Sequence, residues 1–286
     1  FLLIFIGVVN IGRISNKLIF KKENYVETNI ILGLISLSFL IGIALSLKIF
    51  DLYIIKVLIF VSYLSFFYFK KNFFIRSNKI DSLILYIILL FVFFSSIKNN
   101  FYTLDDINGY FHAIDNYISK YNIYSSDLRQ RDYFSYPFYY AFNSLFISIS
   151  NLYSATFFDI FFGSSIILFT SLRNIKYNKI FSSIALLVIF LSYITLLETN
   201  SPKILVIAIL IVILFELEKF FKNESSLIYI LILSSFLITL KFTSIASFTN
   251  ILITVFLIKK IFDKKIKNID ITKSILCFLI LVLPWS

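Results

Sequence analysis

The 286-residue chain is 59% apolar and only 15% charged, and its mean hydropathy is +0.90. Soluble domains are nearer half apolar, and so few charges could not cover so much apolar surface in water, so the composition excludes an ordinary soluble protein. The net charge of +11 does not indicate nucleic-acid binding, because the Lys and Arg residues stand in short clusters between apolar runs, where they orient membrane proteins.

Long apolar runs recur along the whole chain. A helix needs roughly 20 residues to cross a bilayer, and runs close to that length occur about ten times. In chain order the predicted spans are 1–12, 29–47, 52–69, 82–97, 153–171, 180–197, 203–218, 226–240, 242–258 and 274–286. Backbone groups find no water partner in lipid, so these runs must be helices. The sequence therefore predicts an all-α fold, a single polytopic transmembrane helix bundle over residues 1–286.

Both ends of the chain cut into apolar runs. There is no initiator Met, Phe1 lies inside one run, and Ser286 closely follows another, so we expect a fragment of a longer protein, truncated at both ends. Cys277 is the single cysteine, which leaves no disulfide framework and no cysteine-based metal site.

The cationic clusters predict which side of the membrane each connection faces. If residues 13–28 are cytoplasmic, the connections on that side hold 19 of the 27 Lys and Arg residues, and those on the opposite side hold 7. Cytoplasmic loops of membrane proteins are enriched in Lys and Arg. The count therefore places residues 98–136 on the extracytoplasmic side of a membrane that the chain crosses many times.

The predicted loop 98–136 is the one long connection on the extracytoplasmic side, and it contains five of the sixteen acids and the single histidine, His112. Residues 106–121 repeat apolar side chains at the spacing of a helix, which predicts an amphipathic helix lying on the membrane surface. Asp106 borders the apolar stripe on the side of Tyr110, so we expect it to point toward the membrane body more than His112 does.

Two adjacent carboxylates, Asp105 and Asp106, follow the span 82–97 by a few residues. Such a pair can bind a divalent cation such as Mg²⁺ or Mn²⁺, or one carboxylate can act as a general base. An aspartate near the low-dielectric interface has a perturbed proton affinity, which suits acid–base work. Acids at a helix start are also ordinary N-caps and dipole partners, so both interpretations stay open.

Three cationic residues on the same side are candidates for binding a phosphate. Arg129 and Arg131 can hold a phosphate or pyrophosphate in bidentate geometry, at the depth of a lipid headgroup. A solvated loop with internal ion pairs explains them equally well. Lys241 lies between two predicted spans and is either a further phosphate ligand or a simple turn lysine.

Aromatic and charged residues elsewhere suggest two more expectations. The aromatic run within 133–140 predicts an aromatic belt at the membrane interface, or secondarily a platform on which a sugar stacks. Asp159 and Lys56 lie within predicted spans, where charge is expensive, so each is a candidate for a functional site. Lys56 is near enough to a helix end to extend its ammonium group to the interface.

The order of these features resembles the GT-C class of integral-membrane glycosyltransferases. The motif is Leu104-Asp105-Asp106 followed by Tyr110, in the first large external loop, and the stretch DDINGYFHAIDNYISKYNIYSSDLRQRDYFSYPFYYAF is similar to bacterial GT-C-like membrane proteins. A serine–proline turn at 200–202, a lysine turn at 241–244 and a late Pro284-Trp285 turn fall on the same predicted side as the acidic pair.

The resemblance implies transfer of a sugar from a polyprenyl-phosphate-linked donor, in cell-envelope biosynthesis at the bacterial plasma membrane. Asp105 and Asp106 would be catalytic, and the implied substrate-binding residues are Tyr110, His112, Arg129, Arg131 and Lys241. The implied partners are membrane lipids and the lipid-linked donor, not nucleic acid.

Two alternative functions remain. One is an envelope polysaccharide polymerase or ligase, which would rely on Arg and His in later external loops. The other is a non-enzymatic transporter or flippase. Transporters usually have spans broken by Gly and Pro, and the chain has only six Gly and three Pro, which counts against the transporter.

Overall fold

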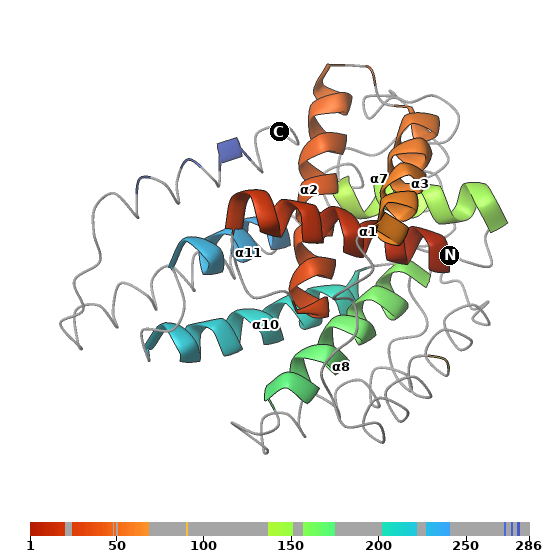
Figure 1. Ribbon diagram of the computed structural model, residues 1–286. Helices are drawn as coiled ribbons and strands as arrows, with labels where there is room; N and C mark the ends of the chain where they lie inside the picture. The colour runs from red at the N-terminus through yellow and green to blue at the C-terminus, as the bar shows by residue number, and fades with distance from the viewer. Residues whose placement is uncertain are drawn as a thin grey trace, which may run out of the picture.

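The structure is a computed structural model, and it describes residues 1–20, 25–47, 49, 51–68, 90, 137–150, 157–174, 202–221, 227–240, 272, 276 and 279–280. The elements within these ranges are α1 (Leu2–Ser15), η1 (Asn16–Phe20), α2 (Val26–Ser46), α3 (Leu52–Tyr68), α7 (Pro137–Ser150), η5 (Phe158–Phe162), α8 (Gly163–Asn174), α10 (Lys203–Phe221) and α11 (Leu227–Leu240). Figure 1 shows their arrangement. Every one of these elements is helical, so the expected all-α class is confirmed for the part of the chain that the structure describes.

One helix within the described ranges is long and apolar enough to cross a bilayer. It is α2, whose most apolar window has a mean hydropathy of 2.2. Of that window, 72% is buried inside the fold, and the core helix of a soluble protein would satisfy the same criterion. Two shorter apolar stretches, Leu52–Leu64 and Ile228–Leu240, lie within α3 and α11. The bundle of about ten spans expected from the sequence therefore goes beyond what these helices establish.

Helix α2 lies at the centre of the described fold and crosses α1 steeply (Figure 1). The backbones meet at one point, where both helices carry glycine. A Cβ atom on Gly12 would overlap the carbonyl oxygen of Asn29 and lie 2.6 Å from the backbone nitrogen of Gly33, and one on Gly33 would overlap the carbonyl oxygen of Val8. Only glycine lets the two backbones approach this closely, as is typical of small residues at helix crossings in membrane proteins.

Helices α8 and α10 run in the same direction. Near their starts, Gly163 lies against the backbone of Ile204 and Leu205, since a Cβ atom there would be 2.8 Å from each. Near their ends, Arg173 interacts electrostatically with Glu216.

Helices α2 and α11 contact each other at two positions. The hydroxyl of Tyr229 interacts with the side chain of Thr28 near both helix starts. Further along both helices, the hydroxyl groups of Ser38 and Thr239 are hydrogen-bonded at 3.2 Å. Glu27 at the start of α2 bonds to Arg173 at the end of α8.

Aromatic rings fill the interior where α7 meets η5. The ring centroid of Phe158 lies 5.5 Å from that of Tyr139 and 4.7 Å from that of Phe142, and Phe138 lies 5.7 Å from Phe236 of α11. Phe138, Tyr139 and Tyr140 are fully buried. The expected interfacial belt or sugar platform is therefore wrong for these three residues, because stacking on one another leaves no ring face exposed.

Candidate functional site

The residues that the sequence singles out for catalysis and binding lie outside the described residues. They are Asp105, Asp106, Tyr110, His112, Arg129, Arg131 and Lys241. The loop 98–136 and its predicted surface helix 106–121 fall outside them as well. The mutual arrangement of the acidic pair and the three cations therefore stays a prediction, and so does a metal held by the acidic pair.

Where the structure is described, charge gathers where α2 begins and α8 ends. The guanidinium of Arg173 donates a hydrogen bond of 2.9 Å to a carboxylate oxygen of Glu27. The same guanidinium lies 3.6 Å from the centre of the Tyr25 ring, in the geometry of a cation–π contact. Glu216 and Lys219 of α10 form a further ion pair at 3.4 Å. These five residues are called the Glu27 cluster below.

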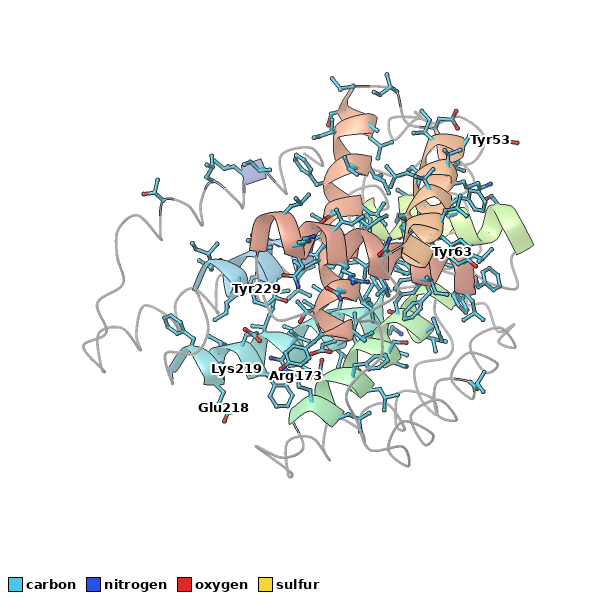
Figure 2. All side chains as sticks on the ribbon, in the orientation of Figure 1. Tyr53, Tyr63, Arg173, Glu218, Lys219 and Tyr229 are labelled. Atoms are coloured by element: carbon cyan, nitrogen blue, oxygen red, sulfur yellow. The ribbon has the colours of Figure 1, made fainter. Side chains whose placement is uncertain are left out.

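The Glu27 cluster is mostly withdrawn from water. Only 6% of the Glu27 side chain and 22% of the Arg173 side chain are exposed. Burial is the largest single influence on the pKa of the Arg173 guanidinium and lowers it, but Glu27, Tyr25 and Glu216 together raise it, so the net shift is upward. In Figure 2, Arg173 and Lys219 lie at this end of the fold, while Glu218 points away from it.

The ion pairs of the Glu27 cluster are suited to holding helices together rather than to catalysis. Each carboxylate already has a cationic partner, and among the described residues no group of three His, Cys, Asp or Glu could hold a metal ion. The cluster joins three helices that are far apart in sequence. In the sequence, Arg173 and Lys219 belong to the cationic clusters that orient the predicted spans, whereas Glu27 is not among the predicted site residues. The signal that could have found Glu27 is its position as the one charged residue of α2, in the first turn.

Asp159, a candidate for a functional site from the sequence, has a structural role. It lies in the wide turn of η5, and its carboxylate accepts hydrogen bonds from the backbone N–H groups of Ile204 at 3.1 Å and Leu205 at 2.7 Å. These groups open α10, where the first N–H groups of a helix have no partner within the helix. Gly163 makes the contact possible, because it is one helical turn after Asp159 and lets the two backbones approach.

Replacing Asp159 by alanine should destabilise the fold. The two buried N–H groups would lose their acceptor, which costs about 2 kcal/mol, at the upper end for helix caps. Asp159→Asn keeps one acceptor oxygen and should cost less. The measurement is the midpoint of thermal unfolding in detergent. Asp51→Ala is the matched control, because Asp51 caps α3 through an exposed 2.7 Å bond to the N–H of Tyr53 and should cost under about 1 kcal/mol. Equal midpoints for both alanine variants would contradict the cap.

Lys56, the other charged residue within a predicted span, is half-buried in α3. Its ammonium nitrogen lies 5.9 Å from the centre of the Tyr53 ring, one turn nearer the start of the helix. This placement agrees with a lysine that extends its charge toward a helix end.

Three comparisons with known proteins give no match to this chain: not with any protein family, any curated protein or any solved structure.

Proposed function

We propose that this protein is a GT-C-like membrane glycosyltransferase that acts at the extracytoplasmic face of a bacterial plasma membrane. The observation that carries the proposal is the acidic pair Asp105-Asp106 in the largest external loop of a strongly apolar chain. The sugar donor would be linked to a polyprenyl phosphate, and the product would belong to the cell envelope.

The proposal that the chain crosses the membrane many times rests on its apolar runs and on the count of cationic residues. That count predicts that 153–171 and 203–218 run toward the cytoplasm and that 29–47 and 226–240 run away from it. Among the described helices, α8 and α10 run in the same direction, as the count requires, whereas α1 and α11 lie across α2 (Figure 1).

The Glu27 cluster gathers where charge counting places the cytoplasm. The Asp159 contact lies at the start of α10, directly after the predicted serine–proline turn 200–202. Ile204 and Glu216 are 12 residues apart, so about 18 Å of helix separates the two groups of contacts along α10.

The proposed reaction divides its roles between acids and cations. Asp105 or Asp106 takes the proton of an acceptor hydroxyl, whose oxygen then forms a bond to the anomeric carbon of the donor sugar. The bond between that carbon and the phosphate oxygen breaks, and its electron pair stays on the lipid phosphate. Arg129, Arg131 and Lys241 stabilise the leaving phosphate.

The remaining site residues orient the substrate. Tyr110 and His112, which follow the acidic pair on the predicted surface helix, contact the sugar. If the acidic pair holds Mg²⁺ or Mn²⁺, the ion supplies positive charge to the leaving phosphate.

Asp106→Asn should reduce sugar transfer by about 10²–10⁴-fold, which is the usual contribution of a general base. The assay measures transfer from a panel of radiolabelled polyprenyl-phosphate sugars in isolated membranes, with protein level checked by immunoblot. Asp115→Asn is the matched control, since it removes one carboxylate from the polar face of the same predicted helix. Full activity in both Asp105→Asn and Asp106→Asn would sink the proposal.

A further inference from the structure

The outward side of α3 is covered with large apolar side chains. The exposed apolar residues are Tyr53, Ile54, Val57, Leu58, Phe60, Val61 and Leu64. At 100° per residue they cover roughly 160° of the helix circumference. Tyr53 is 74% exposed and Val61 57%, so these side chains stand free of the fold. A patch of this kind on a protein surface marks contact with a membrane or another protein.

The opposite side of α3 carries its small and polar residue. Ser62 is buried, and its hydroxyl donates to the carbonyl oxygens of Ile59 and Gly7, at 2.7 Å and 3.1 Å. The side-chain amide of Asn10 donates to the carbonyl oxygen of Ser62 at 2.6 Å. Helix α3 therefore places Ser62 against α1, beside the buried Ile55 and Ile59, and turns an unbroken row of large apolar groups outward.

The described helices also bury polar side chains within a core that is mainly large and apolar. They include Ser38, Asn143, Ser144, Ser234, Ser235 and Thr239. In a soluble protein serine and asparagine are mostly exposed, and an extended exposed apolar face is unusual. Buried polar residues together with a large apolar face turned outward, as on α3, are typical of helices in lipid, where apolar groups gain nothing from being buried in protein.

We infer that the outward face of α3 is in contact with lipid acyl chains. This inference rests on the membrane placement in the proposed function and adds which surface meets the lipid. A second copy of the chain fits the face less well. Helix pairs in membranes associate through small residues, and between Tyr53 and Leu64, where the side chains of α3 are described, the outward face carries none, because Ser62 points to α1. The exposed arc is also broader than the narrow seam of a helix pair.

The end of α3 near Asp51 marks where the lipid-facing surface meets the headgroups. Tyr53 has an apolar ring and a polar hydroxyl, and Lys56 has an apolar stem and a charged tip, so both suit the boundary between acyl chains and water. They lie on the first turns of the helix, next to the Asp51 cap. From there the outward face continues to Leu64 without a charged side chain.

The test compares the two sides of one helix. Val57→Cys and Val61→Cys on the outward side, and Ile55→Cys and Ile59→Cys on the inward side, are each made in a Cys277→Ser background and labelled with a nitroxide. Collision of the label with oxygen, which concentrates in lipid, and with a water-soluble nickel chelate is measured in phospholipid vesicles. The outward labels should collide with oxygen several-fold more often than the inward labels, and rarely with nickel.

Two results would overturn the inference. Frequent nickel collisions at positions 57 and 61 would place this face in water. Infrequent collisions with both reagents, together with spin–spin broadening that disappears on dilution with unlabelled protein, would place a second copy on it. If the inward variants fail to fold, the oxygen and nickel collision rates of the two outward labels still show whether this face is in lipid, in water or against a second copy. The result is independent of catalysis, because an inactive Asp106→Asn variant would give the same collision rates.

Discussion

Replacing Gly12 by leucine should separate α1 from α2 and leave the protein unable to reach its folded state. A Cβ atom at this position would overlap the backbone of Asn29 and of Gly33, and backbone in the middle of a helix cannot move aside as a side chain can. Overpacking in a core costs about 1–3 kcal/mol where side chains can yield. The cost here should exceed that range, because neither contacting group is a side chain. The expected result is loss of the monodisperse peak in size-exclusion chromatography in detergent.

Replacing Gly12 by alanine, a smaller change, tests the close helix crossing by the sign of the change in stability. At an exposed helix position, Gly→Ala stabilises by about 1 kcal/mol, because alanine loses less backbone entropy. At Gly12 the sign should reverse, and Gly12→Ala should lower the unfolding midpoint, since its methyl group meets the carbonyl of Asn29. Ile14→Leu, an exposed residue of the same helix, is the control and should leave the midpoint unchanged. A higher midpoint for Gly12→Ala would contradict the close helix crossing.

Arg173→Met should destabilise the fold by about 3 kcal/mol, the lower end of the range for breaking a buried ion pair. The lower end applies because Arg173 is partly exposed, at 22%, whereas Glu27 is nearly covered, at 6%. Most of the loss comes from the Glu27 carboxylate, which would be left inside the fold without its 2.9 Å partner. The measurement is the unfolding midpoint, and Lys17→Met, an exposed lysine, is the control for loss of one charge.

Adding Glu27→Gln to Arg173→Met should recover much of that loss. Neutral partners of similar shape remove the uncompensated charge, and replacing both members of a buried pair is often close to neutral. The double-mutant cycle thus measures the coupling between the two residues directly. If the two single changes simply add, the two residues are not coupled and the ion pair does not hold α2 to α8.

The boundaries of several helices were predictable from apolar run length. The predicted spans 203–218 and 226–240 correspond to Lys203–Phe221 and Leu227–Leu240 in the structure. The run length sufficed because polar and charged residues interrupt each run near its ends. The helix Pro137–Ser150 is not among the predicted spans, because the aromatic residues at its start favour an interfacial belt. They instead pack on η5 in the interior, a contact that depends on where that segment folds.

For the candidate site, the sequence predicts which residues belong to it but not how they are arranged in space. An acidic pair and cationic residues in one external loop indicate chemistry by residue type, but Asp105, Asp106 and Arg129 lie outside the described residues, so their distances are not established. Asp159 was recognised as unusual because a charge in an apolar run is costly. Its partners were not predictable, since the backbone of Ile204 and Leu205 offers no signal in the sequence of the helix that carries Asp159.

The sequence alone determined the apolar, helical character of the chain, the extent of its longer helices and the balance of cationic charge between alternate connections. These properties depend on the local order of residue types. The tertiary structure decided which helix faces turn inward and which distant residues meet. The helices are apolar on nearly all sides, so hydrophobicity could not choose a face. Which faces turn inward depends instead on contacts between residues far apart in the chain. Examples are the close backbone approach at Gly12 and Gly33 and the ion pair of Glu27 with Arg173.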